Sequence, residues 1–160
     1  MPPRAVKRSA ASAAAGVRVR AVQPGDLAQV VDIDAEVTGL RKRAYWKDVL
    51  DRYGRPGSAQ SFFLVAADGP AVLGYVVGEV RDWEFGSPPC GWVFGISVRP
   101  DARLGGLGAQ LLGAILKSFR QAGVKKVRTM LSRDNHLILS FFRSQGMMAG
   151  PFIPLELDIE

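Results

Sequence analysis

The most informative stretch of this sequence is VRPDARLGGLGAQLLGAI, residues 98–115. It ends an apolar run, places Gly105, Gly106 and Gly108 within four positions, and then opens a helix-period pattern of apolar residues. Where a buried strand gives way to a helix, unpaired backbone N–H groups meet the positive end of the helix dipole. Such a place stabilises an anion, most simply a phosphate, and glycine lets the ligand approach the backbone closely. A flexible turn before an amphipathic helix is the alternative, and the density of glycines favours the ligand.

Two common phosphate-binding motifs do not fit these glycines. A P-loop needs Gly-Lys-Ser/Thr, but Gly108 is followed by Ala109 and Gln110. The dinucleotide fingerprint G-x-G-x-x-G, counted from Gly106, places Leu111 where its third glycine belongs. The sequence therefore excludes both nucleotide motifs.

Length and composition are those of an ordinary globular protein with one domain. The chain has 160 residues, of which 48% are hydrophobic and 22% charged. No apolar run approaches the roughly 20 residues of a membrane span, so we expect no membrane association. The single Cys90 excludes an internal disulfide, and one Cys with one His provides no zinc spacing, so we expect no metal. A reducing, cytoplasmic location fits this cysteine usage.

The net charge of +6 is concentrated at the N-terminus. Residues 1–20 hold five Arg or Lys and no acid, which leaves 16 basic and 15 acidic residues in the remainder. We interpret residues 1–16 as a disordered, basic, Ala/Ser-rich tail and residues 17–160 as the domain. An organellar transit peptide ranks below that interpretation. Because the body is close to neutral, we do not expect a nucleic-acid partner.

The hydrophobic periodicity predicts a mixed α/β unit with the element order β-α-α-β-β-β-α-β-α-β. Helices are expected from Leu27, capped near Asp26, and over residues 41–55, 106–121 and 136–145, the last capped by Asp134 or Asn135. Strands are expected at residues 17–22, 61–67, 71–80, 92–98, 124–131 and 152–159. The free edge of the last strand could pair with a second subunit, which makes a homodimer one possible state.

One longer pattern does fit the glycines. Arg103, Gly106 and Gly108 match R-x-x-G-x-G/A, which resembles the acyl-CoA signature of the GCN5-related N-acetyltransferase (GNAT) superfamily. The resemblance extends from Val17 onward and includes the PGDL turn, the hairpin FFLVAADGPAVLGYVVGEV and the ending NHLILSFFRSQGM. It implies the GNAT fold, a central mixed sheet flanked by helices, and acetyl-CoA as the cosubstrate.

The resemblance also implies which residues hold the acyl-CoA. Backbone groups of Ile96, Ser97 and Val98 would pair with the amides of the pantetheine arm, as an added strand would. Main-chain N–H groups in the signature would surround the diphosphate, and two residues near the C-terminus would contact the cosubstrate. The signature residues are Arg103, Leu104, Gly105, Gly106, Leu107, Gly108 and Ala109, and the two further residues are Asn135 and Phe142.

Two residues depart from the family pattern at positions that transfer protons. The family often has a tyrosine acid where this chain has Phe142, and many members have a glutamate base where this chain has Trp92. A thiol with a pKa of about 8.5 can leave as thiolate, but an alkylamine with a pKa of about 10.4 must lose a proton before it attacks. We name Glu79 and Glu84 as candidate general bases, directly or through water, ahead of Glu36 and Glu156.

These observations predict an N-acetyltransferase that moves the acetyl group from acetyl-CoA to a primary or N-terminal amine by direct attack in a ternary complex. No nucleophile for a covalent intermediate is evident. The competing hypothesis is a catalytically weak or inactive acyl-CoA-binding module or sensor, because Trp92 and Phe142 occupy both proton-transfer positions. The sequence does not identify the amine acceptor, which is a small molecule or a protein amine.

Overall fold

The computed structural model describes residues 16–160, which form two compact units, residues up to Thr129 and residues 130–160. The predicted basic tail therefore lies outside the described residues, apart from Gly16. No helix in the described part of the chain is long and apolar enough to cross a membrane.

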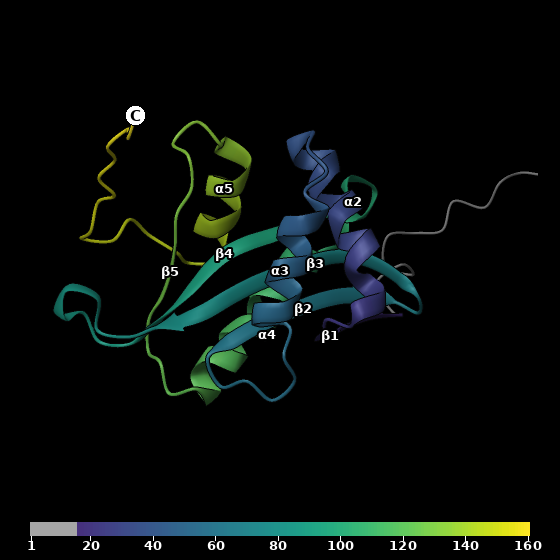
Figure 1. Cartoon of the computed structure of the whole chain (residues 1–160), viewed down its shortest axis with the longest axis horizontal. Coiled ribbons are helices and arrows are strands. Elements are labelled where there is room, and N and C mark those ends of the chain that lie inside the picture. Colours follow the sequence, from purple (N-terminus) through teal and green to yellow (C-terminus); the bar gives the residue numbers. More distant parts are fainter. Residues whose placement is uncertain (1–15) are drawn as a thin grey trace, which may run out of the picture. The chain divides into compact units, whose positions relative to one another are not determined.

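The first unit is built on a five-stranded mixed sheet in the order β1-β2-β3-β4-β5 (Figure 1). The first four strands are antiparallel neighbours, and β5 runs parallel to β4. The mixed α/β class predicted from the sequence is thereby confirmed. The strands are β1 (Val17–Ala21), β2 (Ser61–Asp68), β3 (Ala71–Arg81), β4 (Cys90–Val98) and β5 (Val127–Thr129).

Three helices of the first unit cover the two faces of this sheet. Helices α2 (Leu27–Thr38) and α3 (Arg43–Tyr53) bury an aromatic and aliphatic core that includes Trp46, Phe63 and Tyr75. Helix α4 (Leu107–Gln121) packs on the opposite face. Short 3-10 turns precede α2 and α4 and interrupt the loop between β3 and β4: η1 (Pro24–Asp26), η3 (Pro100–Gly105) and η2 (Glu84–Gly86).

Glycines in β3 and β4 let α4 lie close to the sheet. A Cβ on Gly78 would lie 2.9 Å from side-chain atoms of Ile115 and Phe119, and one on Gly91 would lie 2.7 Å from Phe119. Both distances are shorter than van der Waals contact. The apolar side chains of α4 therefore pack directly on the backbone of β3 and β4, and α4 lies close to the sheet.

The entrance to α2 is held by an ion pair rather than by the predicted cap. The Asp26 side chain makes no capping bond to α2; it lies 2.7 Å from the Arg20 guanidinium and accepts the Gln23 N–H at 2.7 Å. The hydrogen bond from Arg20 lowers the pKa of the Asp26 carboxyl. Asp26 thus ties the turn to β1.

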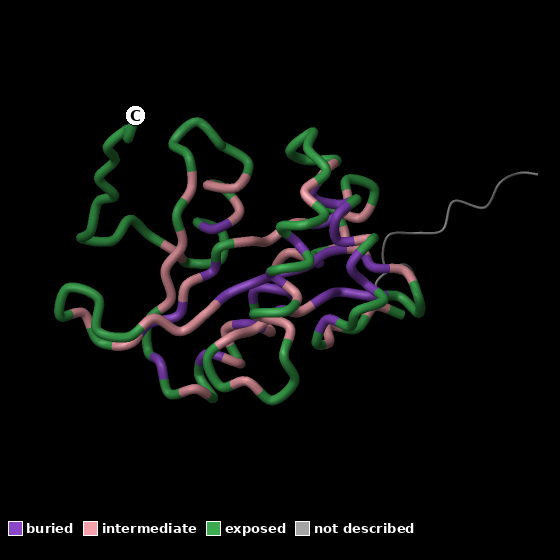
Figure 2. The backbone as a smooth tube through the Cα atoms, viewed as in Figure 1, coloured by how far each residue is buried: buried purple, intermediate pink, exposed green. Residues whose placement is uncertain are grey.

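The middle of the sheet and the inner sides of α2 and α4 carry most of the buried residues, drawn purple in Figure 2. Val65, Val72, Val76 and Val77 are fully shielded from solvent. Alternate residues of β3 point to opposite faces of the sheet: Gly78 lies against α4, whereas Tyr75 and Val77 belong to the core under α2 and α3. Beyond Val77, the residues of β3 on the α3 face are Glu79 and Arg81, and Arg81 ends the strand.

The second unit contains one helix, α5 (His136–Ser144). Of the two predicted caps, Asn135 is the one observed: its Oδ1 accepts the Ile138 N–H at 3.2 Å. The strand predicted at 152–159 is wrong, because the structure assigns no strand to residues 147–160. The alternating pattern is present, but Ile153 and Leu155 are 77% and 88% exposed. A strand is stable only beside a partner that takes its backbone hydrogen bonds, and this segment pairs with none in the described chain.

Candidate functional site

Strand β4 has an edge that its neighbour covers only in part. β5 pairs with Gly91, Trp92 and Val93 and ends there, where the Thr129 hydroxyl donates to the Val93 carbonyl at 2.7 Å. At the next residue the register between β3 and β4 shifts, so Phe94 bulges out of the ladder. The part of β4 that follows the bulge, residues 95–98, pairs with β3 alone among the described strands.

The register shows which backbone groups this edge presents. The Arg99 N–H donates to Leu73 on the β3 side, and successive residues of a strand direct their backbone groups to opposite sides. Ile96 and Val98 therefore present N–H and C=O groups on the open side. Ser97, which the sequence placed with them, directs its backbone toward Tyr75 of β3. The open edge thus offers alternate donors and acceptors to a ligand that carries amides.

The glycine-rich turn follows the open edge directly. Gly106 adopts a left-handed conformation (φ 73°, ψ 17°) between η3 and α4, and a Cβ built there would have no heavy atom within 4 Å. The first N–H groups of α4, from Leu107 onward, have no partner inside the helix. The Arg103 side chain turns back and donates to the Val98 carbonyl at 3.3 Å. The signature arginine thereby ties the turn to the open strand, and the exposed Leu104 and the half-buried Gly105 lie within η3.

The candidate base Glu79 lies directly across the strand pair from Trp92. Paired residues of antiparallel strands direct their side chains to the same face, with Cβ atoms about 5 Å apart. The position in β4 at which the GNAT resemblance implies a base is therefore occupied by an indole, and a carboxylate lies beside it on β3. The Glu79 side chain is 27% exposed, so water and a substrate can reach it.

Glu84, the second candidate base, lies in η2 and shares a cation with Glu79. The Arg81 Nε lies 3.0 Å from Glu79 Oε1 and 3.7 Å from Glu84 Oε1. The Arg81 guanidinium also lies over the Trp92 ring, 4.4 Å from its centroid. The structure thus brings both predicted bases together around one arginine.

An aromatic wall borders Glu79 on the side of α3. The Tyr53 ring packs edge-to-face on Phe94 with their centroids 4.9 Å apart, and the Tyr53 hydroxyl accepts a hydrogen bond from Arg52 at 3.0 Å. Burial and then the negative charge of Glu79 raise the pKa of Tyr53. Tyr53 therefore stays protonated near neutrality, as a hydroxyl close to the carboxylate.

The remaining predicted residues fall elsewhere. Asn135 and Phe142 belong to the second unit, where Asn135 caps α5 and Phe142 is buried and packs on Phe141 with centroids 5.2 Å apart. Glu36 is exposed on α2, and Glu156 is exposed beyond α5.

Asp34 is a buried carboxylate that the sequence analysis missed. It accepts the Trp46 indole N–H at 2.9 Å and lies 3.1 Å from the Lys42 ammonium. Its charge adds to burial in raising the pKa of Tyr75. The sequence pattern could have predicted its burial, because Asp34 lies four residues after Val30 and so falls on the buried face of α2.

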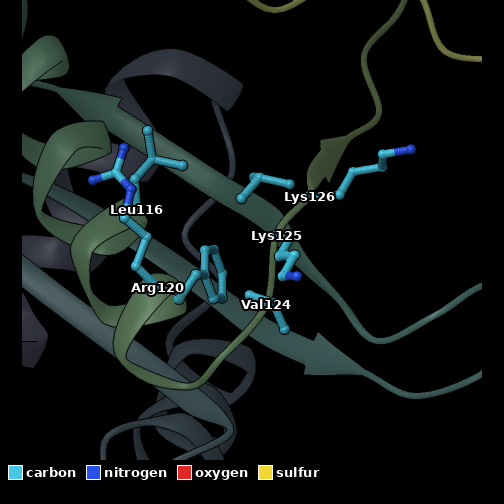
Figure 3. A pocket seen from close by; sticks show the side chains of 7 residues that line it. Leu116, Arg120, Val124, Lys125 and Lys126 are labelled. Carbon is cyan, nitrogen blue, oxygen red and sulfur yellow. The ribbon is translucent and has the colours of Figure 1, made fainter.

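A pocket of about 380 Å³ lies between the end of α4 and the start of β5 (Figure 3). Its walls are apolar and cationic, with Phe119, Arg120 and Lys125 among them. It has no carboxylate and shares no residue with the predicted site. The open edge of β4 and the cluster around Glu79 therefore remain the candidate site.

Comparison with known proteins agrees with this architecture. The model of the Acetyltransferase (GNAT) family matches residues 28–147. A mycothiol acetyltransferase from Saccharomonospora viridis is 30% identical over 163 aligned positions, which cover 91% of this chain and 48% of the relative. The chain thus spans about half the length of that relative.

Two solved structures show the same fold at low sequence identity. The aminoglycoside N-acetyltransferase AAC(6')-Iy in complex with CoA superposes with a TM-score of 0.76 at 15% identity, covering 89% of this chain and 94% of its own. Ard1 from Thermoplasma volcanium superposes with a TM-score of 0.68 at 23% identity, covering 82% of each chain. The family match, the relative and the shared fold lead to one conclusion: the chain belongs to the GNAT family of acetyltransferases.

Proposed function

We propose that the protein is an acetyl-CoA-dependent N-acetyltransferase that acetylates a primary or N-terminal amine in a ternary complex. The observation that carries this proposal is the open edge of β4, which presents the backbone groups of Ile96 and Val98 and leads directly into the glycine turn at Gly106. Family membership and the CoA complex of a protein with the same fold support it.

The residues at this edge fit the chemistry of the donor. Acetyl-CoA supplies an acetyl group activated as a thioester, carried on an arm with two amides and a diphosphate. The N–H and C=O groups of Ile96 and the N–H of Val98 match the amides, because they can pair as with an added strand, while the Val98 C=O accepts from Arg103. The N-terminus of α4 matches the diphosphate, because its first N–H groups and its dipole both favour an anion. Gly106 keeps that approach free of side-chain atoms.

Glu79 is the residue we assign as general base. It lies beside Trp92 on the face that Tyr53 and Phe94 border, and it remains partly open to solvent. An acceptor ammonium must lose its proton before its nitrogen attacks, and a positioned carboxylate, directly or through one water, can take it. Glu84 is farther from Arg81 and more exposed, which favours a role in attracting the acceptor.

The leaving thiolate needs less help than the amine. With a pKa of about 8.5 it can depart without a proton donor, so Phe142 at the family's tyrosine position does not prevent transfer. A lost acid is expected to cost no more than about 10²–10⁴-fold in rate.

The direct test combines a transfer assay with a binding assay. CoA release from acetyl-CoA is followed with a thiol reagent against polyamines, amino acids, aminoglycosides and N-terminal peptides, and CoA binding is measured by calorimetry. Turnover with one acceptor class is the expected result, and absence of CoA binding would refute the proposal. Aminoglycosides are included in this panel because AAC(6')-Iy, which has the same fold, is an aminoglycoside N-acetyltransferase.

A CoA-binding module without transfer is the second candidate function. It is favoured by Trp92, which leaves β4 without the family's carboxylate. Tight CoA binding together with no turnover over the whole amine panel would select it over the enzyme.

A further inference from the structure

Arg81 occupies a box that is built to hold a cation. Its walls are the carboxylate of Glu79, 3.0 Å from Arg81 Nε, the carboxylate of Glu84, 3.7 Å from the same atom, and the face of Trp92, 4.4 Å from the guanidinium carbon. Two negative charges and one aromatic face thus surround a single positive charge of the chain itself.

The same walls would hold an ammonium group equally well. Carboxylates accept charge-assisted hydrogen bonds from any alkylammonium, and the face of an indole attracts cations in general. The box is also open to ligands, because the side chains of Arg81, Glu79 and Glu84 are 34%, 27% and 47% exposed. A cation arriving from solvent can therefore compete with Arg81 for the same partners.

We propose that Arg81 is an intramolecular competitor of the acceptor: the acceptor's ammonium displaces the guanidinium from Glu79, and Arg81 thereby sets the acceptor KM. This inference rests on the proposed function, in which Glu79 receives the acceptor. No covalent step is involved, since one cation replaces another. When Arg81 leaves, both Glu79 and Glu84 lose their cation, so acceptors with two or more ammonium groups are favoured over monoamines.

A purely structural ion pair predicts the opposite behaviour. If Arg81 only fastened the loop after β3, its removal would loosen Glu84 and Trp92 and weaken the binding of any ligand there. A competitor predicts that removal strengthens the binding of cations. The direction of the change therefore separates the two roles.

The binding test uses Arg81→Gln, which removes the charge and leaves a shorter polar side chain. Spermidine is titrated into both proteins while the indole N–H resonance of Trp92, assigned with Trp92→Phe, is followed by NMR. We expect the apparent Kd for spermidine to fall about fivefold to tenfold in Arg81→Gln, the size of a partly exposed ion pair and cation–π contact. Arg81→Lys, which retains a cation, should remain close to the wild type. Arg41→Gln is the matched control, because it breaks an exposed ion pair with Asp32 outside the box.

Kinetics give the second readout. With an accepted polyamine, Arg81→Gln should lower KM by a similar factor, whereas removal of an ion pair that only fastens the loop should raise KM. A Kd for spermidine that is unchanged or raised in a folded Arg81→Gln protein overturns the inference, and so does a Trp92 resonance that spermidine does not shift. The titration requires no acetyl transfer, so tighter spermidine binding together with no turnover over the whole amine panel would overturn the proposed enzyme and leave the cation site standing.

Discussion

The glycine turn offers the sharpest test of where the cosubstrate binds. Gly106 has φ 73°, and a Cβ at this position would meet no heavy atom within 4 Å. Any other residue at this position therefore causes no clash, but its left-handed backbone lowers the stability of the fold by about 1–2 kcal/mol. Gly106→Glu and Gly106→Gln should carry this same cost and differ only in charge.

The charge has a calculable effect if the diphosphate binds at the start of α4. A glutamate carboxylate about 8 Å from one phosphate charge, at an effective dielectric constant of about 20, contributes about 2 kcal/mol of repulsion. That corresponds to a CoA affinity about 30-fold lower in Gly106→Glu than in Gly106→Gln. Added salt should narrow this gap, because the site is exposed and its charges are screened.

Calorimetric titration of CoA into the wild type and the two variants measures the gap, and circular dichroism confirms that each variant is folded. Dephospho-CoA serves as a ligand control, because it retains the diphosphate and should preserve the difference between Glu and Gln. Equal CoA affinities for the two folded variants would refute the placement of the diphosphate at this turn.

Three further predictions concern the base, the sheet and the turn before α2. Glu79→Gln should lower kcat by about 10²–10⁴-fold, because it removes the proton acceptor, while calorimetric CoA affinity stays at the wild-type value. Gly91→Ala should destabilise the fold by about 1–3 kcal/mol, because the added methyl meets Phe119 at 2.7 Å, and a thermal melt with an unchanged Tm would count against this packing. The lowered pKa of Asp26 means that its stabilisation is complete above the unfolded pKa of about 3.9 and is lost as pH falls through the lower folded value. In urea unfolding at several pH values, Asp26→Asn should therefore be less stable than the wild type near neutrality and should converge with it in acid.

Local patterns were sufficient to predict most of the fold. The apolar runs in 61–67 and 71–80 and the turn between them identify the hairpin of β2 and β3, because apolar runs and turn chemistry are both local. The segment 152–159 alternates apolar and acidic residues from Leu155 onward, yet it forms no strand. Alternation reports that a segment can present one apolar face, whereas pairing depends on a partner that the segment itself does not specify.

The site was harder to predict than the fold because it depends on register. Ile96, Ser97 and Val98 look equivalent in the sequence. In the structure the backbone of Ser97 points toward β3, whereas the backbone groups of Ile96 and Val98 point to the other side. Glu79 and Trp92 are adjacent for the same reason. A slip of one residue between β3 and β4 would direct the two side chains to opposite faces.

This adjacency yields a last prediction about the base. Glu79 and Trp92 are cross-strand partners, so a carboxylate at position 92 would lie about 5 Å from the one at position 79. Trp92→Glu placed in Glu79→Gln should therefore restore part of the lost kcat, about tenfold or more, because the amine needs a base on this face and not on one particular strand. The double variant Glu79→Gln/Trp92→Gln is the control, since it removes the indole equally and supplies no base. Equal kcat values for the two double variants, with CoA affinity unchanged in both, would show that a carboxylate at position 92 cannot take the role of Glu79 and would refute this prediction.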